Sequence, residues 1–252
     1  MKKALLILCL LICAVLLVGC SSNTSSNDSP TQVPIITDAP DPKAEIIGSK
    51  FDGDILFNDI KWGTNRDEVF KVLKGKFPNI RESDCTEYEY GKIKMVVYTY
   101  TGIGKVGDMK VDELYVRYLN EEGKYDYALF NADYYCEDLS VYKSMAEMLE
   151  YKYGTPYSHK VDNSITDDSV YDVDSFTWRN KDGSQALTIT RNNNVHDLAK
   201  ALGMAGLGKI YDENIRIWYR DVGMDNYYDQ QKEIYNAQQK DEEMSNKDYN
   251  GL

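Results

Sequence analysis

Residues 111–135 read VDELYVRYLNEEGKYDYALFNADYY, and this stretch determines the architecture that we expect. Residues 111–119 alternate between apolar and polar side chains, which is the pattern of a strand with one buried face. Glu121-Glu-Gly-Lys124 then supplies a glycine-containing turn. Residues 125–135 are again rich in aromatic residues and return as the second arm. The stretch therefore predicts an antiparallel β-hairpin.

A helix is predicted on each side of this hairpin. The first begins after Thr64, which suits the N-cap, and it ends at Pro78. Val69, Leu73 and Phe77 recur along it at helical spacing. The second covers 139–153 and ends at Gly154, before Thr155-Pro156.

Further strands are predicted over 92–101, 174–180, 185–191 and 214–220. The resulting order is helix, three strands, helix, three strands, with pseudo-repeats over 57–136 and 139–220. We expect an α+β fold: an antiparallel sheet of about six strands, with two helices on one face, in a tandem repeat of one helix and three strands. Residues 192–209 form a long insertion between the last two strands, with a short helix expected at 195–202.

The N-terminal region has the pattern of a secreted, lipid-anchored chain. Met1-Lys-Lys precedes an apolar run over 4–18, and Leu17-Val-Gly-Cys20 resembles the lipobox of bacterial lipoproteins. That resemblance implies a signal peptide over 1–19, a lipidated Cys20 and an extracytoplasmic location at the cell membrane; an uncleaved anchor helix is the alternative. Residues 20–50 are rich in Ser, Asn and Pro and predict a flexible tether, with an arm packed on the domain as the alternative. The folded domain is expected over 51–224, followed by a C-terminal helix with a frayed tail over 225–252.

Composition excludes several function classes. The formal net charge of −12 argues against a nucleic-acid partner, which requires a basic surface. Two histidines leave little material for a histidine-built metal site, and we expect neither a metal nor a cofactor. The acidic cluster over 167–174 could hold calcium, but it lacks the glycine and terminal glutamate of a calcium loop and fits a solvated loop better. No catalytic residues are indicated, and we expect no enzyme.

Two cysteines remain in the expected domain. Cys85 and Cys136 form an even pair in an extracytoplasmic chain, and this permits a disulfide. The alternative is two separate small apolar side chains.

Short motifs suggest a resemblance to known proteins. Trp62-Gly-Thr64 with Glu68-Val69, and Lys152-Tyr-Gly-Thr-Pro156, resemble the "WGT…EV" and "KYGxP" motifs of small secreted proteins of unknown function. The arrangement of helix and strands is similar to that of beta-lactamase-inhibitor-protein-like domains. The resemblance implies an antiparallel sheet backed by helices, a binding role and no enzymatic activity.

Strand alternation assigns side chains to the two faces of the sheet. Leu114, Val116 and Tyr118, together with Ala128, Phe130 and Ala132, are expected toward the helices. The opposite, helix-free face then carries six candidate partner-binding residues: Tyr115, Arg117, Arg179, Arg216, Trp218 and Arg220. Either Tyr127 or Phe130 is expected beside them on the same face. Four of the seven arginines fall on this face, and Arg, Tyr and Trp are enriched in interface hot spots.

The sequence therefore predicts a cell-surface lipoprotein that binds a protein or peptide through this face. An open face with solvated cross-strand pairs is the structural alternative. An inhibitor of a secreted hydrolase, with residues 192–209 as its projecting loop, is the second functional candidate. A carbohydrate-binding role, suggested by the 21 tyrosines, or an enzymatic role is the third. Partner identity and oligomeric state are left open.

Overall fold

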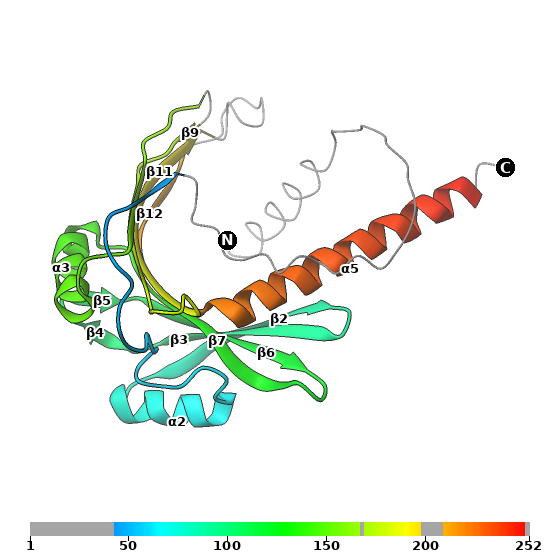
Figure 1. Cartoon of the computed structure of the whole chain (residues 1–252), viewed down its shortest axis with the longest axis horizontal. Coiled ribbons are helices and arrows are strands. Elements are labelled where there is room, and N and C mark those ends of the chain that lie inside the picture. The colour runs from blue at the N-terminus through cyan, green and yellow to red at the C-terminus, as the bar shows by residue number, and fades with distance from the viewer. Residues whose placement is uncertain (1–42, 167–168, 198–208, 250–252) are drawn as a thin grey trace. The chain divides into compact units, whose positions relative to one another are not determined.

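The computed structural model describes residues 43–166, 169–197 and 209–249, all of which belong to one unit. The expected leader, the lipidation site and most of the expected tether lie outside these residues. Figure 1 shows the helices and strands in their arrangement. Their bounds are β1 (Ala44–Ile46), α2 (Arg66–Lys76), β2 (Arg81–Tyr90), β3 (Ile93–Thr101), β4 (Gly104–Val106), β5 (Met109–Val111), β6 (Glu113–Glu121), β7 (Tyr125–Cys136), the 3₁₀ helix η1 (Leu139–Val141), α3 (Tyr142–Tyr153), β8 (Ser158–Asp162), β9 (Ser169–Val170), β10 (Val173–Arg179), β11 (Gln185–Asp197), β12 (Lys209–Asp221) and α5 (Val222–Tyr249).

A ten-stranded antiparallel sheet dominates the fold. Its strand order is β1-β8-β10-β11-β12-β7-β6-β3-β2, and β9 pairs separately with β11. The two meanders β2-β3-β6-β7 and β8-β10-β11-β12 meet where β12 pairs with β7. A separate two-stranded sheet contains β4 and β5.

The two faces of the large sheet are covered by different helices. On one face, here called the outer face, α2 and α3 bury Val69, Leu73, Met145 and Leu149 in the main core. On the opposite or inner face, α5 buries Tyr228 with three sheet residues in a second, smaller core: Ile93, Leu119 and Phe130. Figure 1 shows α5 on the opposite side of the sheet from α2 and α3.

The expected fold class is therefore wrong in three respects. The sheet has ten strands rather than six, three α-helices are present among the described residues, and the tandem repeat of one helix and three strands is not the arrangement found. The missed strands are short or polar. β2, for example, is exposed along nearly its whole length at the sheet edge, so neither of its faces needs an apolar row.

A β-bulge changes the predicted facing of one arm of the hairpin. Arg117 pairs with Asn131, but the next pair is Tyr118 with Leu129, so that Phe130 is the extra residue. Of the two facings that alternation left open for Phe130, the one toward the inner face is found, because its ring packs with Tyr228 of α5. Tyr127, the alternative inner-face residue, packs instead against the main core.

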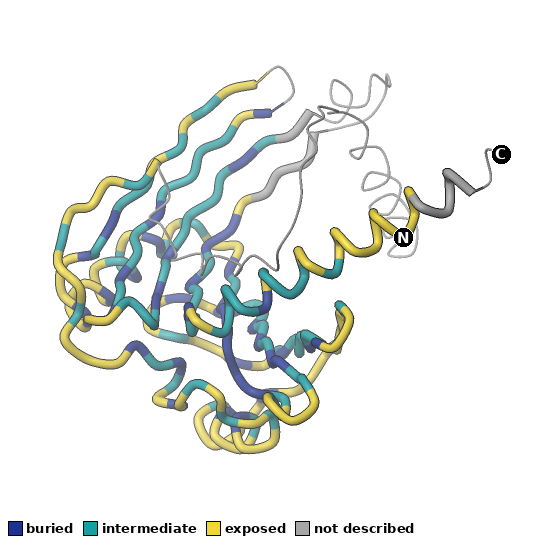
Figure 2. Tube along the Cα trace, turned by 45° about the vertical axis from the view of Figure 1, so that its right-hand side comes forward, coloured by how far each residue is buried: buried dark blue, intermediate teal, exposed yellow. Residues whose placement is uncertain are grey.

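The C-terminal helix begins earlier than expected. The Asp221 carboxylate accepts a hydrogen bond from the Met224 amide at 2.8 Å and caps the first turn of α5. Residues 236–244 of this helix are exposed, as Figure 2 shows. Within the described residues, no helix combines the length and apolar character needed to cross a membrane.

The expected insertion at 192–209 contains strand rather than helix at its described ends. Residues 192–197 extend β11 and pair with 209–214 of β12. The short helix expected at 195–202 is thus wrong over 195–197, and residues 198–208 lie outside the described part of the chain.

Candidate functional site

The strand register places all six candidate partner-binding residues on the inner face. Directly paired residues in antiparallel strands point to the same side of a sheet. Tyr115, Asp133 and Trp218 are joined in one row across β6, β7 and β12. The neighbouring row joins Arg117, Asn131, Arg220, Ala186 and Arg179, and a third row contains Tyr135, Arg216 and Thr190.

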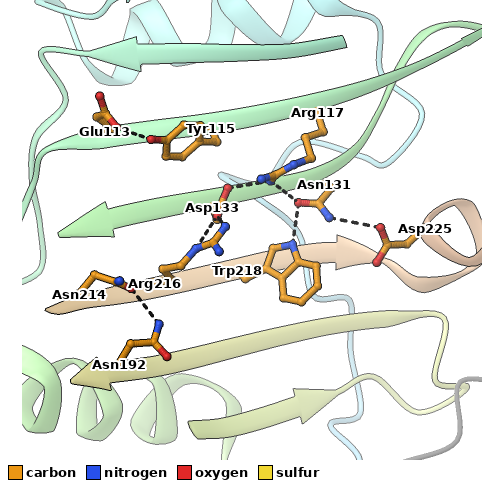
Figure 3. Close-up of polar contacts among 10 residues, drawn as sticks. All are labelled: Glu113, Tyr115, Arg117, Asn131, Asp133, Asn192, Asn214, Arg216, Trp218 and Asp225. Carbon is orange, nitrogen blue, oxygen red and sulfur yellow. Dashed lines mark hydrogen bonds and ion pairs between the residues drawn. The ribbon is translucent and has the colours of Figure 1, made fainter. Parts of the chain in front are cut away.

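The centre of the site is a fully buried carboxylate held by two arginines. The Asp133 side chain has 0% exposure, and its Oδ1 accepts a hydrogen bond from Arg117 Nη1 at 2.7 Å. Its Oδ2 accepts from Arg216 Nε at 2.9 Å and also from Arg216 Nη2. Figure 3 shows the two guanidinium groups converging on this carboxylate. A buried charge requires such compensation, so the three residues form one unit.

The two arginines differ in how far they reach solvent. The Arg117 side chain is 20% exposed, whereas that of Arg216 is 41% exposed. Two guanidinium groups share one carboxylate, so the triad has a net positive charge. Arg216 is the member that presents this charge to solvent.

A second set of contacts connects the triad to α5. The Asn131 side-chain oxygen accepts hydrogen bonds from Arg117 at 2.9 Å and from Trp218 Nε1 at 2.6 Å. Its amide nitrogen donates to Asp225 of α5 at 3.3 Å (Figure 3). Arg220 pairs with Asp225 at 3.5 Å, and its guanidinium lies 4.7 Å from the Trp218 ring centroid.

Burial raises the pKa of Asp225, and the nearby Arg220 opposes this shift. Asp225 also lies in the first turn of α5, where a carboxylate interacts favourably with the helix dipole. Arg220 thus links the sheet directly to α5, whereas Arg117 bonds to two residues of the neighbouring strand β7.

The inner face is therefore not helix-free, which corrects the expected open surface. Tyr228 of α5 contacts the β3, β6 and β7 part of the sheet through Ile93, Leu119 and Phe130. The rest of the inner face, over β10, β11 and β12 with Arg216 at its margin, is here called the polar platform. It presents three partly exposed threonines: Thr177, Thr188 and Thr190. The hydroxyl groups of Thr177 and Thr188 are hydrogen-bonded to each other at 3.0 Å.

Tyr115 lies on β6, two residues from Arg117 of the triad, and Arg179 lies on β10, outside the triad. The Tyr115 hydroxyl donates to the Glu113 carboxylate, and burial, reinforced by this bond, raises the Tyr115 pKa. Arg179 lies two strands away from Arg216 and is not part of the triad. Its guanidinium is 5.8 Å from the Tyr157 ring centroid. At the far end of the polar platform, Asn192 donates a side-chain hydrogen bond to Asn214 at 2.9 Å (Figure 3).

Three residues that organise the site were not predicted from the sequence: Asn131, Asp133 and Asp225. The signal for the first two was present, because they occupy alternate positions in the otherwise apolar and aromatic arm 128–136. Polar residues at such positions need partners when buried, and the two arginines of neighbouring strands are those partners. Asp225 could not be singled out in this way, because it belongs to a helix in which charged residues are common.

The candidate disulfide is absent, since Cys85 and Cys136 are both free thiols. Cys85 is exposed on β2 and Cys136 is buried on β7. Strands β3 and β6 lie between them, which corresponds to about 14 Å at the normal strand spacing. A disulfide needs a Cα separation below about 7 Å. Among the described residues, no group of three or more His, Cys, Asp or Glu side chains could hold a metal ion.

Comparison with models of known protein families, with curated proteins and with solved structures finds no match to this chain. The geometry of the inner face is therefore the basis for the function proposed below.

Proposed function

We propose that this protein is a membrane-anchored, extracytoplasmic binding module that recognises a protein or peptide through the polar platform and Arg216. The observation that carries the proposal is the half-exposed Arg216 guanidinium, which is held in place by the fully buried Asp133 carboxylate. The lipobox-like leader supports the location, and the two acyl chains expected at Cys20 would give stable anchoring.

A preorganised arginine suits recognition of a carboxylate. Two contacts to Asp133 fix the orientation of the Arg216 side chain, so that less conformational freedom is lost when a ligand binds. The triad has a net positive charge although the whole chain is acidic. A planar guanidinium also matches a carboxylate partner in shape. An acidic side chain or a C-terminal carboxylate of the partner is therefore the expected contact.

The surroundings of Arg216 favour a polypeptide partner. Trp218 lies two residues from Arg216 on β12, and Tyr115 lies two strands away on β6. Both provide aromatic surface, and the threonines of β10 and β11 provide hydrogen-bonding groups. Arginine, tryptophan and tyrosine together are typical of interface hot spots.

Affinity capture from the native cell envelope tests the proposal. The full-length protein, its Arg216→Met variant and a Lys181→Met control would each be used as bait. Lys181 is an exposed cation in the β10–β11 turn, outside the polar platform. We expect the same partner to be captured by the wild type and by the control, and to be lost with Arg216→Met. Equal capture by all three baits would reject the polar platform as the binding surface.

A further inference from the structure

The outer face contains a pocket that is separate from the polar platform. It has a volume of about 460 Å³ and lies between α3, β10 and the segment around Ile47. This volume falls within the range of small-molecule sites, about 300–1,000 Å³. Trp178, which lines the pocket, belongs to the main core beneath α3, whereas the triad lies on the opposite face of the sheet.

The apolar wall of the pocket consists of aromatic rings whose polar atoms are already bonded. The Tyr142 hydroxyl donates to the Asp174 backbone oxygen at 3.0 Å, and Trp178 Nε1 donates to the Gly154 backbone oxygen at 2.8 Å. Phe176 stacks against His159 with ring centroids 4.3 Å apart. These contacts hold the rings in place, so the wall is formed before any ligand binds.

The N-terminal segment closes one side of the pocket. The Ile47 amide donates to the Tyr157 backbone oxygen at 3.0 Å, which places the Ile47 side chain at the pocket wall. Gly48 follows, where a Cβ atom would lie 2.3 Å from the Pro156 backbone oxygen. Glycine is therefore required for this close approach, and the wall depends on it.

The charged residues of the pocket are mainly acidic. Glu147, Glu150 and Asp174 line it together with a single cation, Lys143. Lys143 pairs with Glu147 at 3.8 Å, and Asp174 bonds to His159 at 2.8 Å. The Glu150 carboxylate forms no hydrogen bond or ion pair with another side chain in the described part of the chain, and it is the group best placed to accept an external cation.

We propose that this pocket binds a small organic amine with an aromatic or aliphatic body. The body would pack against Phe176 and Trp178, and the ammonium group would lie toward Glu150, since the Asp174 carboxylate already bonds to His159. This inference is independent of the proposed function, because it concerns the other face of the sheet.

The test uses the full-length protein in a non-ionic detergent, labelled with 5-fluorotryptophan. The chain has three tryptophans, so ¹⁹F spectra contain one signal for each, and Trp62→Phe and Trp218→Phe variants assign them. The probe is 2-phenylethylamine, and 2-phenylethanol is its uncharged counterpart. We expect the amine to shift the Trp178 signal in a saturable manner and to leave the Trp218 signal in place. The alcohol should bind more weakly.

Matched carboxylate variants complete the test. Glu150→Gln should weaken binding of the amine roughly threefold, as expected for a partly exposed ion pair, without affecting the alcohol. Glu122→Gln, in the β6–β7 turn far from the pocket, should have no effect. Three results would overturn the proposal: no saturable shift of the Trp178 signal, equal binding of amine and alcohol, or unchanged amine binding by Glu150→Gln.

Discussion

Replacement of Asp133 by Asn tests whether the arginine triad is a single buried electrostatic unit. The substitution keeps the size of the side chain and removes its charge. Arg117 and Arg216 would then face each other across a neutral amide in a region where the original carboxylate has 0% exposure. We expect a large loss of stability, because both cations lose the group that compensates them.

The structure sets the relative size of two effects. Removal of one partner from a buried ion pair costs about 3–5 kcal/mol, and Asp133→Asn belongs in this range. Arg216→Met should cost about 1–2 kcal/mol, because the Arg117–Asp133 pair survives and the lost arginine was already 41% exposed. In a domain of this size each kcal/mol lowers Tm by about 2–4 °C. We therefore expect Asp133→Asn to lower Tm by about 10 °C and Arg216→Met by only a few degrees.

Chemical denaturation of the two single variants and the double variant measures the coupling. The double variant should be more stable than the sum of the single losses indicates, since removal of Arg216 relieves repulsion that Asp133→Asn creates. Additive losses, or a cost below about 1 kcal/mol for Asp133→Asn, would refute the view that these residues form one buried unit.

Three other predictions follow from the described contacts and the leader. Asp225→Asn should be at least as stable as the wild type at neutral pH, because burial raises the folded-state pKa of Asp225 and so makes its ionised form costly. This advantage should shrink as the pH falls through the raised folded-state pKa of Asp225 and should be gone once the pH reaches the unfolded-state value of 3.8. Thermal unfolding across pH would show it, and a fixed stability loss at every pH would contradict it. Tyr228→Ala should cost about 3 kcal/mol and accelerate hydrogen exchange in the first turns of α5, whereas unchanged exchange there would mean that this ring does not hold the helix on the sheet. Cys20→Ser should move the protein from the detergent phase to the aqueous phase in a phase-partition assay, and retention in the detergent phase would argue against lipid anchoring at that residue.

The hairpin at 111–135 was predictable because alternation and a glycine turn act together over a short range. The facing of its second arm was not, because the bulge at Phe130 inserts one residue and reverses the alternation beyond it. A single sequence gives no clear sign of that insertion. As a consequence, Phe130 lies on the inner face, where it packs against Tyr228 of α5.

Edge strands and the packing of the terminal helix escaped prediction for a different reason. β2 and β8 are largely polar, and a strand at or near the sheet edge needs little apolar surface. The helical character of 225–246 was visible in the sequence. The face of the sheet that it covers depends on a few contacts around Tyr228, which a weakly amphipathic pattern cannot specify.

The candidate site was predicted in part. Alternation predicts Arg216 and Trp218 on the same face of the sheet, and the observed strand register agrees. The roles of Arg117 and Arg220 could not be assigned, because their partners Asp133, Asn131 and Asp225 come from elements that meet only in the folded chain. Both arginines form ion pairs within the protein, which the sequence alone did not indicate.

Site-specific photo-crosslinking in the native cells tests the central claim most directly. A photoreactive residue would replace Thr190, which pairs with Arg216 on the inner face, and in a second variant Tyr151, which is 95% exposed on α3. Our account predicts a discrete protein or peptide adduct from position 190, its loss when Arg216→Met is added, and no such adduct from position 151. Adducts that form equally from both positions, or that persist without Arg216, would contradict it.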